Sequence, residues 1–327
     1  MEKWTYTEGL HEVGNGTFAY LQPYRKVSGA DKLSAWGWSN AGLVVDGQGN
    51  DAQTLLVDTL YDIPLTQKMH NTMIQAVPAA AHIDIVANTH SNGDHTNGNM
   101  LFKESKIIAS LATVEEMKAE PDPSVMAMIA EKAPADGLTG MTLKPFNFRG
   151  IQKTYATETF DSVKTFSLGS KTITLMKVGP AHTKGDTLVF VPEDKVCYTG
   201  DIIFNQAHPI IWAGPVQSWI QACDTILAQD VNIIVPGHGP IAGREVVSEI
   251  KDYLGYIYDE AKQRHDAGMT PLEAANDISL ERYASWLDDE RIIPNVFAVY
   301  RELDGTPVEN VHKLFDYMDA WTRARRK

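Results

Sequence analysis

The stretch Asn88–Asn99, which reads NTHSNGDHTNGN, brings imidazole and carboxylate side chains close together in the chain. Within it, His90, Asp94 and His95 are residue types that bind metal ions in proteins. The apolar run at 83–87 directly precedes the stretch and is typical of a buried strand. A polar loop after such a strand has irregular backbone that can surround an ion. We therefore predict a metal site at the sheet edge where this strand ends.

Three later segments carry further ligand residue types, and each follows an apolar, strand-like run. They read GPAHT at 179–183, YTGD at 198–201 and VPGHGP at 235–240. With the first stretch, they resemble the metallo-β-lactamase-fold superfamily. That superfamily has an H-x-H-x-D-H motif, then a histidine after a strand, an aspartate in a Gly-Asp turn and a late histidine between glycines. Here the second histidine of the motif is replaced by Asn92.

This resemblance covers roughly residues 17–245 and implies an α/β fold, a four-layer αβ/βα sandwich. It also implies two half-sites for metal ions. The first half-site would comprise His90, Asn92 and His182, the second Asp94, His95 and His238, and Asp201 would bridge both.

The second half-site has a complete ligand set, which suits Zn²⁺ and leaves an open position for water. Water on such an ion has a pKa of about 7, so hydroxide forms at neutral pH, and Asp94 is expected to orient it. The first half-site is expected to be empty, weakly filled or selective for Mn²⁺, with Fe²⁺ as a further alternative, because an amide is a weaker ligand than imidazole. Asn92 could instead donate its NH₂ group to a substrate oxygen in the transition state. The sequence leaves these roles open.

Two aromatic segments are candidates for substrate binding. Trp36 and Trp38 flank a glycine in a polar loop, and the run at 202–212, which contains Phe204, His208 and Trp212, is unusually apolar for a loop. Aromatic side chains at the mouth of a metal site are typical substrate contacts. The alternatives are indoles packed on the core and a hydrogen-bonded loop histidine.

The resemblance implies a metal-dependent hydrolase that cleaves an ester, lactone or activated aromatic ether bond in a small, largely apolar substrate. The asparagine variant is also similar to bacterial hydrolases that degrade aromatic compounds, such as dinitroanisole demethylase. Two alternatives remain. One is an iron-dependent redox member of the same fold, and the other is a binding protein whose catalysis was lost with the histidine at position 92.

The composition indicates which kinds of partner and which cellular compartment to expect. The chain has 327 residues, 43% of them hydrophobic, which is enough for a large core. A net charge of −13 argues against a nucleic-acid partner. With only two cysteines, no disulfide framework is indicated. Residues 1–6 show no apolar leader, and no run approaches the ~18 apolar residues of a membrane span. We expect a cytoplasmic protein with no membrane partner.

The resemblance implies a catalytic domain over 1–245, and the helical periodicity predicts a C-terminal extension over 246–327, packed on the same domain. No linker rich in Gly, Ser or Pro separates them. Helical patterns cover 244–267, 280–287, 294–303 and 308–325. These helices either pack on the cleft or pair with another subunit, which would make a homo- or hetero-oligomer. The Pro-rich segment 120–150 is expected to form an insertion or a mobile cover near the cleft.

Overall fold

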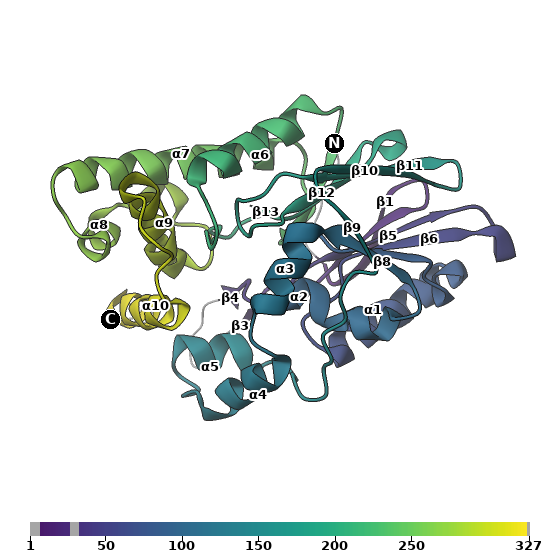
Figure 1. The fold of residues 1–327 in the computed structure, drawn as a ribbon, viewed down its shortest axis with the longest axis horizontal. Coiled ribbons are helices and arrows are strands. Elements are labelled where there is room, and N and C mark those ends of the chain that lie inside the picture. The colour runs from purple at the N-terminus through teal and green to yellow at the C-terminus, as the bar shows by residue number, and fades with distance from the viewer. Residues whose placement is uncertain (1–6, 27–32, 326–327) are drawn as a thin grey trace.

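Two β-sheets lie face to face in the computed structural model of the chain, with helices on their outer sides (Figure 1). The structure describes residues 7–26 and 33–325. The segment 1–6, on which the expectation of no leader depends, lies outside the described residues.

The first sheet contains seven strands in the order β1-β2-β5-β6-β7-β8-β9. Pairing is antiparallel from β1 to β6 and parallel from β6 to β9. Parallel neighbours need a crossover, and helix α1 makes the one between β6 and β7. The strands are β1 (Gly9–Gly14), β2 (Thr17–Leu21), β5 (Ala41–Asp46), β6 (Gln53–Val57), β7 (Ile85–Ala87), β8 (Lys106–Ser110) and β9 (Glu158–Phe160).

The second sheet contains five strands in the order β10-β11-β12-β13-β14. Its last pair, β13 and β14, is parallel, and helix α6 connects them. The strands are β10 (Val163–Leu168), β11 (Lys171–Lys177), β12 (Thr187–Val191), β13 (Val196–Phe204) and β14 (Ile233–His238). A small separate hairpin consists of β3 (Arg25–Lys26) and β4 (Leu33–Ser34).

Helices cover the outer face of each sheet, which gives the expected four layers. Their bounds are α1 (Ile63–Ala76), α2 (Gly93–Thr96), α3 (Leu111–Ala119), α4 (Pro123–Lys132), α5 (Leu138–Leu143), α6 (Val216–Ala228), α7 (Glu245–Asp266), α8 (Pro271–Asp277), α9 (Ile292–Asp304) and α10 (Val311–Arg325). Figure 1 shows α6 and α7 along one side, and α10 lying beside α5.

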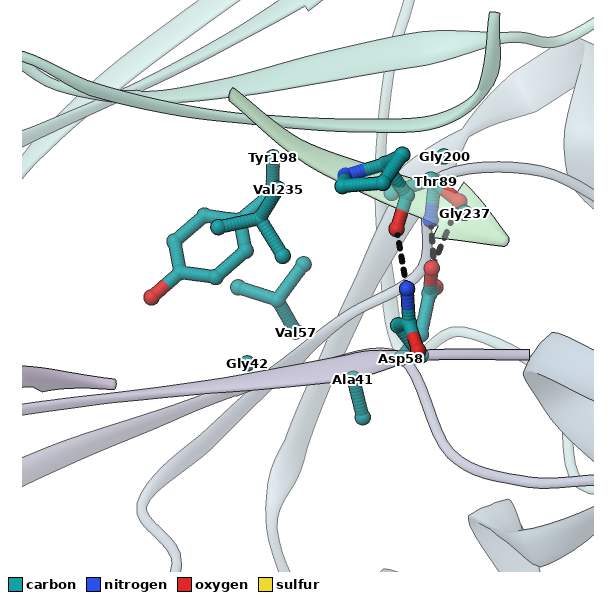
Figure 2. Close-up of a pocket in the computed structure, with 11 residues that line it drawn as sticks. Ala41, Gly42, Val57, Asp58, Thr89, Tyr198, Gly200, Val235 and Gly237 are labelled. Atoms are coloured by element: carbon teal, nitrogen blue, oxygen red, sulfur yellow. Dashed lines mark hydrogen bonds between the residues drawn. The ribbon is translucent and has the colours of Figure 1, made fainter. Parts of the chain in front are cut away.

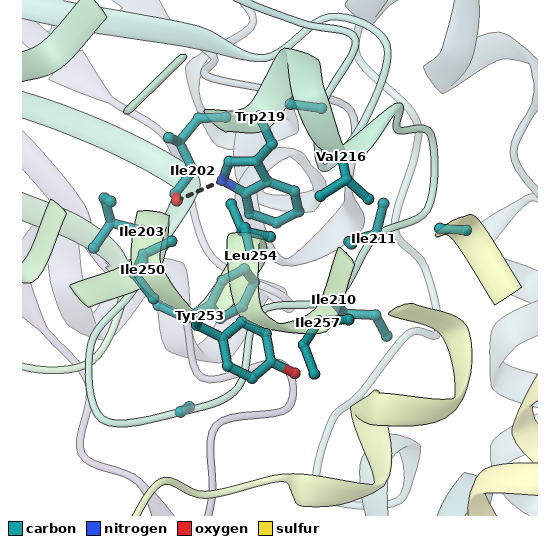
Figure 3. Close-up of a cluster of buried hydrophobic side chains, with 14 of the residues drawn as sticks. Ile202, Ile203, Ile210, Ile211, Val216, Trp219, Ile250, Tyr253, Leu254 and Ile257 are labelled. Atoms are coloured by element: carbon teal, nitrogen blue, oxygen red, sulfur yellow. Dashed lines mark hydrogen bonds between the residues drawn. The ribbon is translucent and has the colours of Figure 1, made fainter. Parts of the chain in front are cut away.

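Three apolar clusters hold these layers together. One lies between the sheets and includes Val57 and Val235. A second joins the first sheet to α1 through Met69 and Met73. The third and largest joins the second sheet to α6, α7 and α9. Figure 3 shows its centre, where the Trp219 indole donates a 2.9 Å hydrogen bond to the carbonyl oxygen of Ile202.

The structure corrects two expectations for the C-terminal half. The apolar run at 202–212 begins as strand, because β13 continues to Phe204 and pairs with β14 as far as His238. Residues 280–287 do not form an α-helix. They contain only a 3-10 turn, Glu281–Tyr283, and Asp288 with φ 60° then redirects the chain. Their apolar residues have the spacing of a helix but pack around a turn. The prediction, which used this spacing, was therefore wrong.

The insertion at 120–150 folds into α4 and α5. Within the described ranges, none of the helices combines the length and apolar character needed to span a bilayer.

Candidate metal centre

Both sheets contribute side chains to one site at their shared edge. The loop after β7 supplies His90 and Asn92, and α2 supplies Asp94 and His95. From the second sheet come His182 in the loop after β11, Asp201 within β13 and His238 at the end of β14. We call these seven residues the metal centre. The structure thus brings together every ligand that the sequence suggested.

The carboxylate of Asp201 lies in the middle of this group. Its Oδ1 is 3.1 Å from Nε2 of His95, and its Oδ2 is 3.3 Å from Nε2 of both His182 and His238. Nε2 of His90 lies 3.7 Å from the same Oδ2. Four imidazoles therefore point one nitrogen each at a single carboxylate, as expected of a bridging ligand.

Two overlapping sets of ligand atoms meet the spacing that one ion requires. They are His90, His95 and Asp201, and Asp94, His95 and His238, with all atoms of a set within 4.8 Å of one another. In the second set, Oδ2 of Asp94 lies 3.4 Å from Nε2 of His238. The second set is the second half-site predicted from the sequence, whereas the first set combines His90 of the first half-site with His95 of the second and omits His182.

Each imidazole is oriented by a hydrogen bond at its other nitrogen, Nδ1. Nδ1 of His182 lies 2.7 Å from the carbonyl oxygen of Ile210, and Nδ1 of His238 lies 3.1 Å from that of Trp38. A carbonyl oxygen only accepts, so in both residues Nδ1 carries a proton, and in the neutral imidazole Nε2 presents its lone pair to the centre. Partners of this kind fix metal-binding histidines.

Buried atoms without partners support the presence of a cation. Among the described residues, Nε2 of His90, Nε2 of His95 and Oδ1 of Asp201 are buried without a hydrogen bond. Buried polar atoms are nearly always paired, and exceptions need an explanation. A metal ion among these nitrogen and carboxylate donors would satisfy all three, so the residues present fit a metal.

The electrostatics of the centre agree with this assignment. Burial raises the pKa of a carboxyl group, yet the surrounding imidazoles hold the pKa of Asp201 well below its ordinary value. Burial would lower the pKa of His238, but the carboxylates of Asp201 and Asp94 outweigh it and raise that pKa to about 9. Burial dominates at His90, whose pKa is well below 6.5. Without metal, some ligands of the centre are therefore protonated, and metal binding releases these protons.

Asp58, directly after β6, supports the centre. Its carboxylate accepts hydrogen bonds from the Thr89 backbone N–H and hydroxyl, both at 2.7 Å (Figure 2). The same carboxylate lies 3.0 Å from Nδ1 of His95. It adopts φ 62°, a conformation that Asp and Asn tolerate better than most residues. One carboxylate thereby fixes both the ligand loop and an imidazole.

The Asp58→Asn variant is expected to weaken metal binding about 10- to 100-fold, the usual effect of losing such a support. The amide keeps the shape but has one acceptor oxygen for three donors. Titration of the metal-free protein with Zn²⁺ measures the affinity. Asp62→Asn is the matched control, since Asp62 is equally buried but caps α1 and touches no ligand. Equal affinity in Asp58→Asn and wild type would contradict this role.

The two sheets approach closely beneath the centre, around a small cavity (Figure 2). A Cβ atom on Gly237 would lie 2.0 Å from Oδ1 of Asp201, and one on Gly200 would lie 2.5 Å from the Thr89 hydroxyl. Both contacts are far shorter than van der Waals distance. These glycines therefore allow the ligand-bearing strands to meet.

The predicted substrate residues divide into two groups. Trp36 and Trp212 are half-buried, with ring centroids 6.5 Å apart, and the backbone N–H of Trp212 donates to the carbonyl oxygen of His182. Trp38 packs on Phe146, at 4.7 Å between ring centroids. These three indoles lie at or near the ligand-bearing segments.

Phe204 and His208 lie deeper in the protein. The Phe204 ring is 1% exposed and stacks on His238 at 5.0 Å, so it supports a ligand. His208 is fully buried against Tyr253 and Trp286, and the structure does not bring it to the metal centre.

Sequence reasoning missed three residues around the site. Phe315 of α10 packs on Trp36, with ring centroids 5.5 Å apart. Glu116 and Glu120, at the end of α3, both accept from the Ser91 hydroxyl, at 3.3 and 2.8 Å. The i, i+4 spacing of the two glutamates was the available signal, because it places both on one helix face toward the ligand loop.

Comparison with known proteins agrees with this geometry. Residues 35–238 match the family model of the Metallo-beta-lactamase superfamily. A linear primary-alkylsulfatase from Pseudomonas sp. (strain ATCC 19151) is 24% identical over 178 residues, which are 50% of this chain and 31% of that protein.

Two solved structures are similar in fold. The sec-alkylsulfatase Pisa1 from Pseudomonas sp. matches with a TM-score of 0.65 and 16% identity, over 94% of this chain and 52% of that one. A metallo-beta-lactamase from Pontibacter korlensis matches with a TM-score of 0.54 and 14% identity, over 76% of this chain and 99% of that one. The chain thus spans about a third of the first alkylsulfatase and about half of the second.

Proposed function

Because this chain belongs to the metallo-beta-lactamase superfamily, most of whose members are metal-dependent hydrolases, we propose that it hydrolyses an ester, lactone or activated aromatic ether bond in a small, largely apolar substrate. The observation that carries the proposal is the convergence of four imidazole Nε2 atoms on the Asp201 carboxylate, with buried atoms left for a cation. Such a centre suits hydrolysis, since a bound divalent cation polarises the scissile bond and lowers the pKa of water.

Two carboxylates of the chain would hold the cation and orient the reacting water. Asp201 is 4% exposed and serves as the shared ligand of both half-sites. Asp94 is the more open carboxylate, at 15% exposure, so it is the one that an attacking water can reach. We assign Asp94 a second task, in which its carboxylate accepts a proton from that water.

Aromatic side chains near the centre support an apolar substrate. Trp36, Trp212 and Phe315 form a continuous cluster, in which the rings of Trp212 and Phe315 stack at 6.3 Å. The guanidinium of Arg291 lies between the rings of Trp36 and Phe204, at 4.4 and 5.0 Å. This stacking holds the cluster against the ligand-bearing strand.

We expect Trp212→Ala and Phe315→Ala to raise KM for apolar substrates about 10-fold while kcat changes little. Apolar walls contribute binding that the ground state and transition state share, and an aromatic side chain contributes up to a few kcal/mol. Steady-state kinetics with a homologous series of substrates measures the effect. Phe297→Ala is a control, because that ring packs on Tyr317, on another face of α9 and α10. A change confined to kcat would argue against a binding role.

A second candidate is the hydrolysis of sulfate esters. The specific observation is that an alkylsulfatase structure matches 94% of this chain, whereas the lactamase structure matches 76%. The carboxylates of Glu116 and Glu120 beside the ligand loop favour an uncharged substrate over an anionic one.

Metal analysis combined with a substrate panel tests the proposal. The panel contains aryl and alkyl esters, lactones, thioesters, lactams, aryl ethers and alkyl sulfates. Turnover of an uncharged ester, lactone or aryl ether that a chelator abolishes and Zn²⁺ or Mn²⁺ restores would support it. Turnover of alkyl sulfates alone would favour the second candidate. An iron-loaded, coloured preparation without hydrolysis would favour the redox alternative.

A further inference from the structure

The Asn92 side chain lies between a ligand and a glutamate outside the ligand set. Its Oδ1 is 2.7 Å from Nε2 of His182, and its Nδ2 donates to Oε1 of Glu120 at 3.4 Å. The amide therefore has one end toward the metal centre and the other toward α3.

The hydrogen bond at Nδ1 of His182 determines how the contact between Nε2 of His182 and Oδ1 of Asn92 is interpreted. That nitrogen donates to a carbonyl oxygen, so Nε2 of a neutral His182 has only a lone pair to offer. Two acceptors, Nε2 and Oδ1, then face each other across 2.7 Å. A cation bound by both atoms makes this arrangement favourable.

Glu120 selects this orientation over the reverse. Turning the amide by 180° would let Nδ2 donate to His182, but Oδ1 would then face an acceptor oxygen of Glu120. Glu120 is itself well held. The Ser91 hydroxyl donates to its side chain at 2.8 Å, and the Lys153 ammonium donates to its backbone carbonyl at 2.7 Å. Its position is therefore set by the protein around it.

We propose that Glu120 is a positioning residue that holds the Asn92 carbonyl oxygen toward the half-site of His90, His182 and Asp201. That half-site then offers two imidazole nitrogens and two oxygens, where a third histidine would have made it richer in nitrogen. Oxygen donors suit harder cations, so the affinity of this half-site for Mn²⁺ rises relative to its affinity for Zn²⁺. Asn92 is thus a ligand and not an NH₂ donor to substrate. The inference rests on the metal centre of the proposed function.

Metal titration of the full chain tests this role. Glu120→Leu removes the acceptor and Glu120→Gln retains one. Glu116→Gln changes the neighbouring carboxylate, which accepts from Ser91, whereas Asn92 donates to Glu120. The metal-free proteins are titrated with Mn²⁺ and with Zn²⁺, and bound ions are counted after dialysis. We expect Glu120→Leu to weaken the first half-site for Mn²⁺ at least about 10-fold. The two glutamine variants should stay within about threefold of wild type, and the second half-site should keep its ion in all of them.

The same substitutions in an Asn92→His background separate positioning from general support. An imidazole at position 92 offers no oxygen donor, so Glu120→Leu should there affect Mn²⁺ and Zn²⁺ affinity alike. A loss specific to Mn²⁺ in both backgrounds, or unchanged affinity in Glu120→Leu, would overturn the proposal. Absence of any bound metal in the wild-type protein would instead overturn the proposed function. Metal counts thus distinguish the two failures without an activity assay.

Discussion

Asp201→Ala is expected to abolish tight metal binding and to lower kcat/KM at least about a thousandfold. The carboxylate contacts all four ligand imidazoles, so its removal affects both half-sites at once. Metal catalysis contributes several kcal/mol to such reactions, and each 1.36 kcal/mol is a factor of about ten in rate. Elemental analysis after dialysis and kinetics on the best panel substrate measure the two effects.

The control for this variant is Asp230→Ala, which removes an exposed carboxylate that, within the described part of the chain, forms an ion pair with Lys195. Circular dichroism establishes that both variants are folded. An Asp201→Ala protein that keeps two ions through dialysis would show that the bridging assignment is wrong.

Truncation after Ala242 is expected to give insoluble protein. It removes α7 to α10. Ile250 and Leu254 of α7, labelled in Figure 3, are fully buried in the largest apolar cluster, as is Val296 of α9. Each such side chain contributes about 1.5–3 kcal/mol by burial, and a domain's net stability is only about 5–15 kcal/mol. The soluble fraction after expression is the measurement.

A truncation after Gly305, which removes only α10, is the matched comparison. That helix buries a smaller face, through Leu314, Met318 and Trp321, so this shorter protein should remain soluble. It would also lose Phe315 from the aromatic cluster and should therefore show a raised KM. A soluble, active protein ending at Ala242 would show instead that the C-terminal helices form a separable module.

The ligand positions could be predicted from the sequence because each lies within a short, local pattern. His182 follows β11, Asp201 lies within β13 and His238 ends β14, and these segments meet at one edge of the sandwich. The same reasoning failed after Asp201. There the apolar run continues β13, and periodicity cannot separate a fully buried strand from an apolar loop.

Contacts between segments far apart in the chain could not be predicted from the sequence. Glu120 meets Asn92 across 28 residues, and Phe315 meets Trp36 across most of the chain. The i, i+4 spacing of Glu116 and Glu120 indicates a shared helix face but not the residue it contacts, and Phe315 has no distinctive local pattern. The position of α10 depends on bonds such as that from the Leu138 backbone N–H to Asp319 at 2.8 Å, which only the assembled fold reveals.

Because the ligands of the metal centre come from both sheets, an ion bound there would link the two halves of the sandwich. His95 belongs to the first half and His238 to the second, and neither could reach the other in an unfolded chain. An ion that binds only the assembled form favours folding, by about 2.7 kcal/mol at a free concentration 100 times its dissociation constant. The melting temperature of this protein should therefore follow the free metal concentration of its surroundings, so that metal scarcity would appear as loss of folded protein as well as loss of activity.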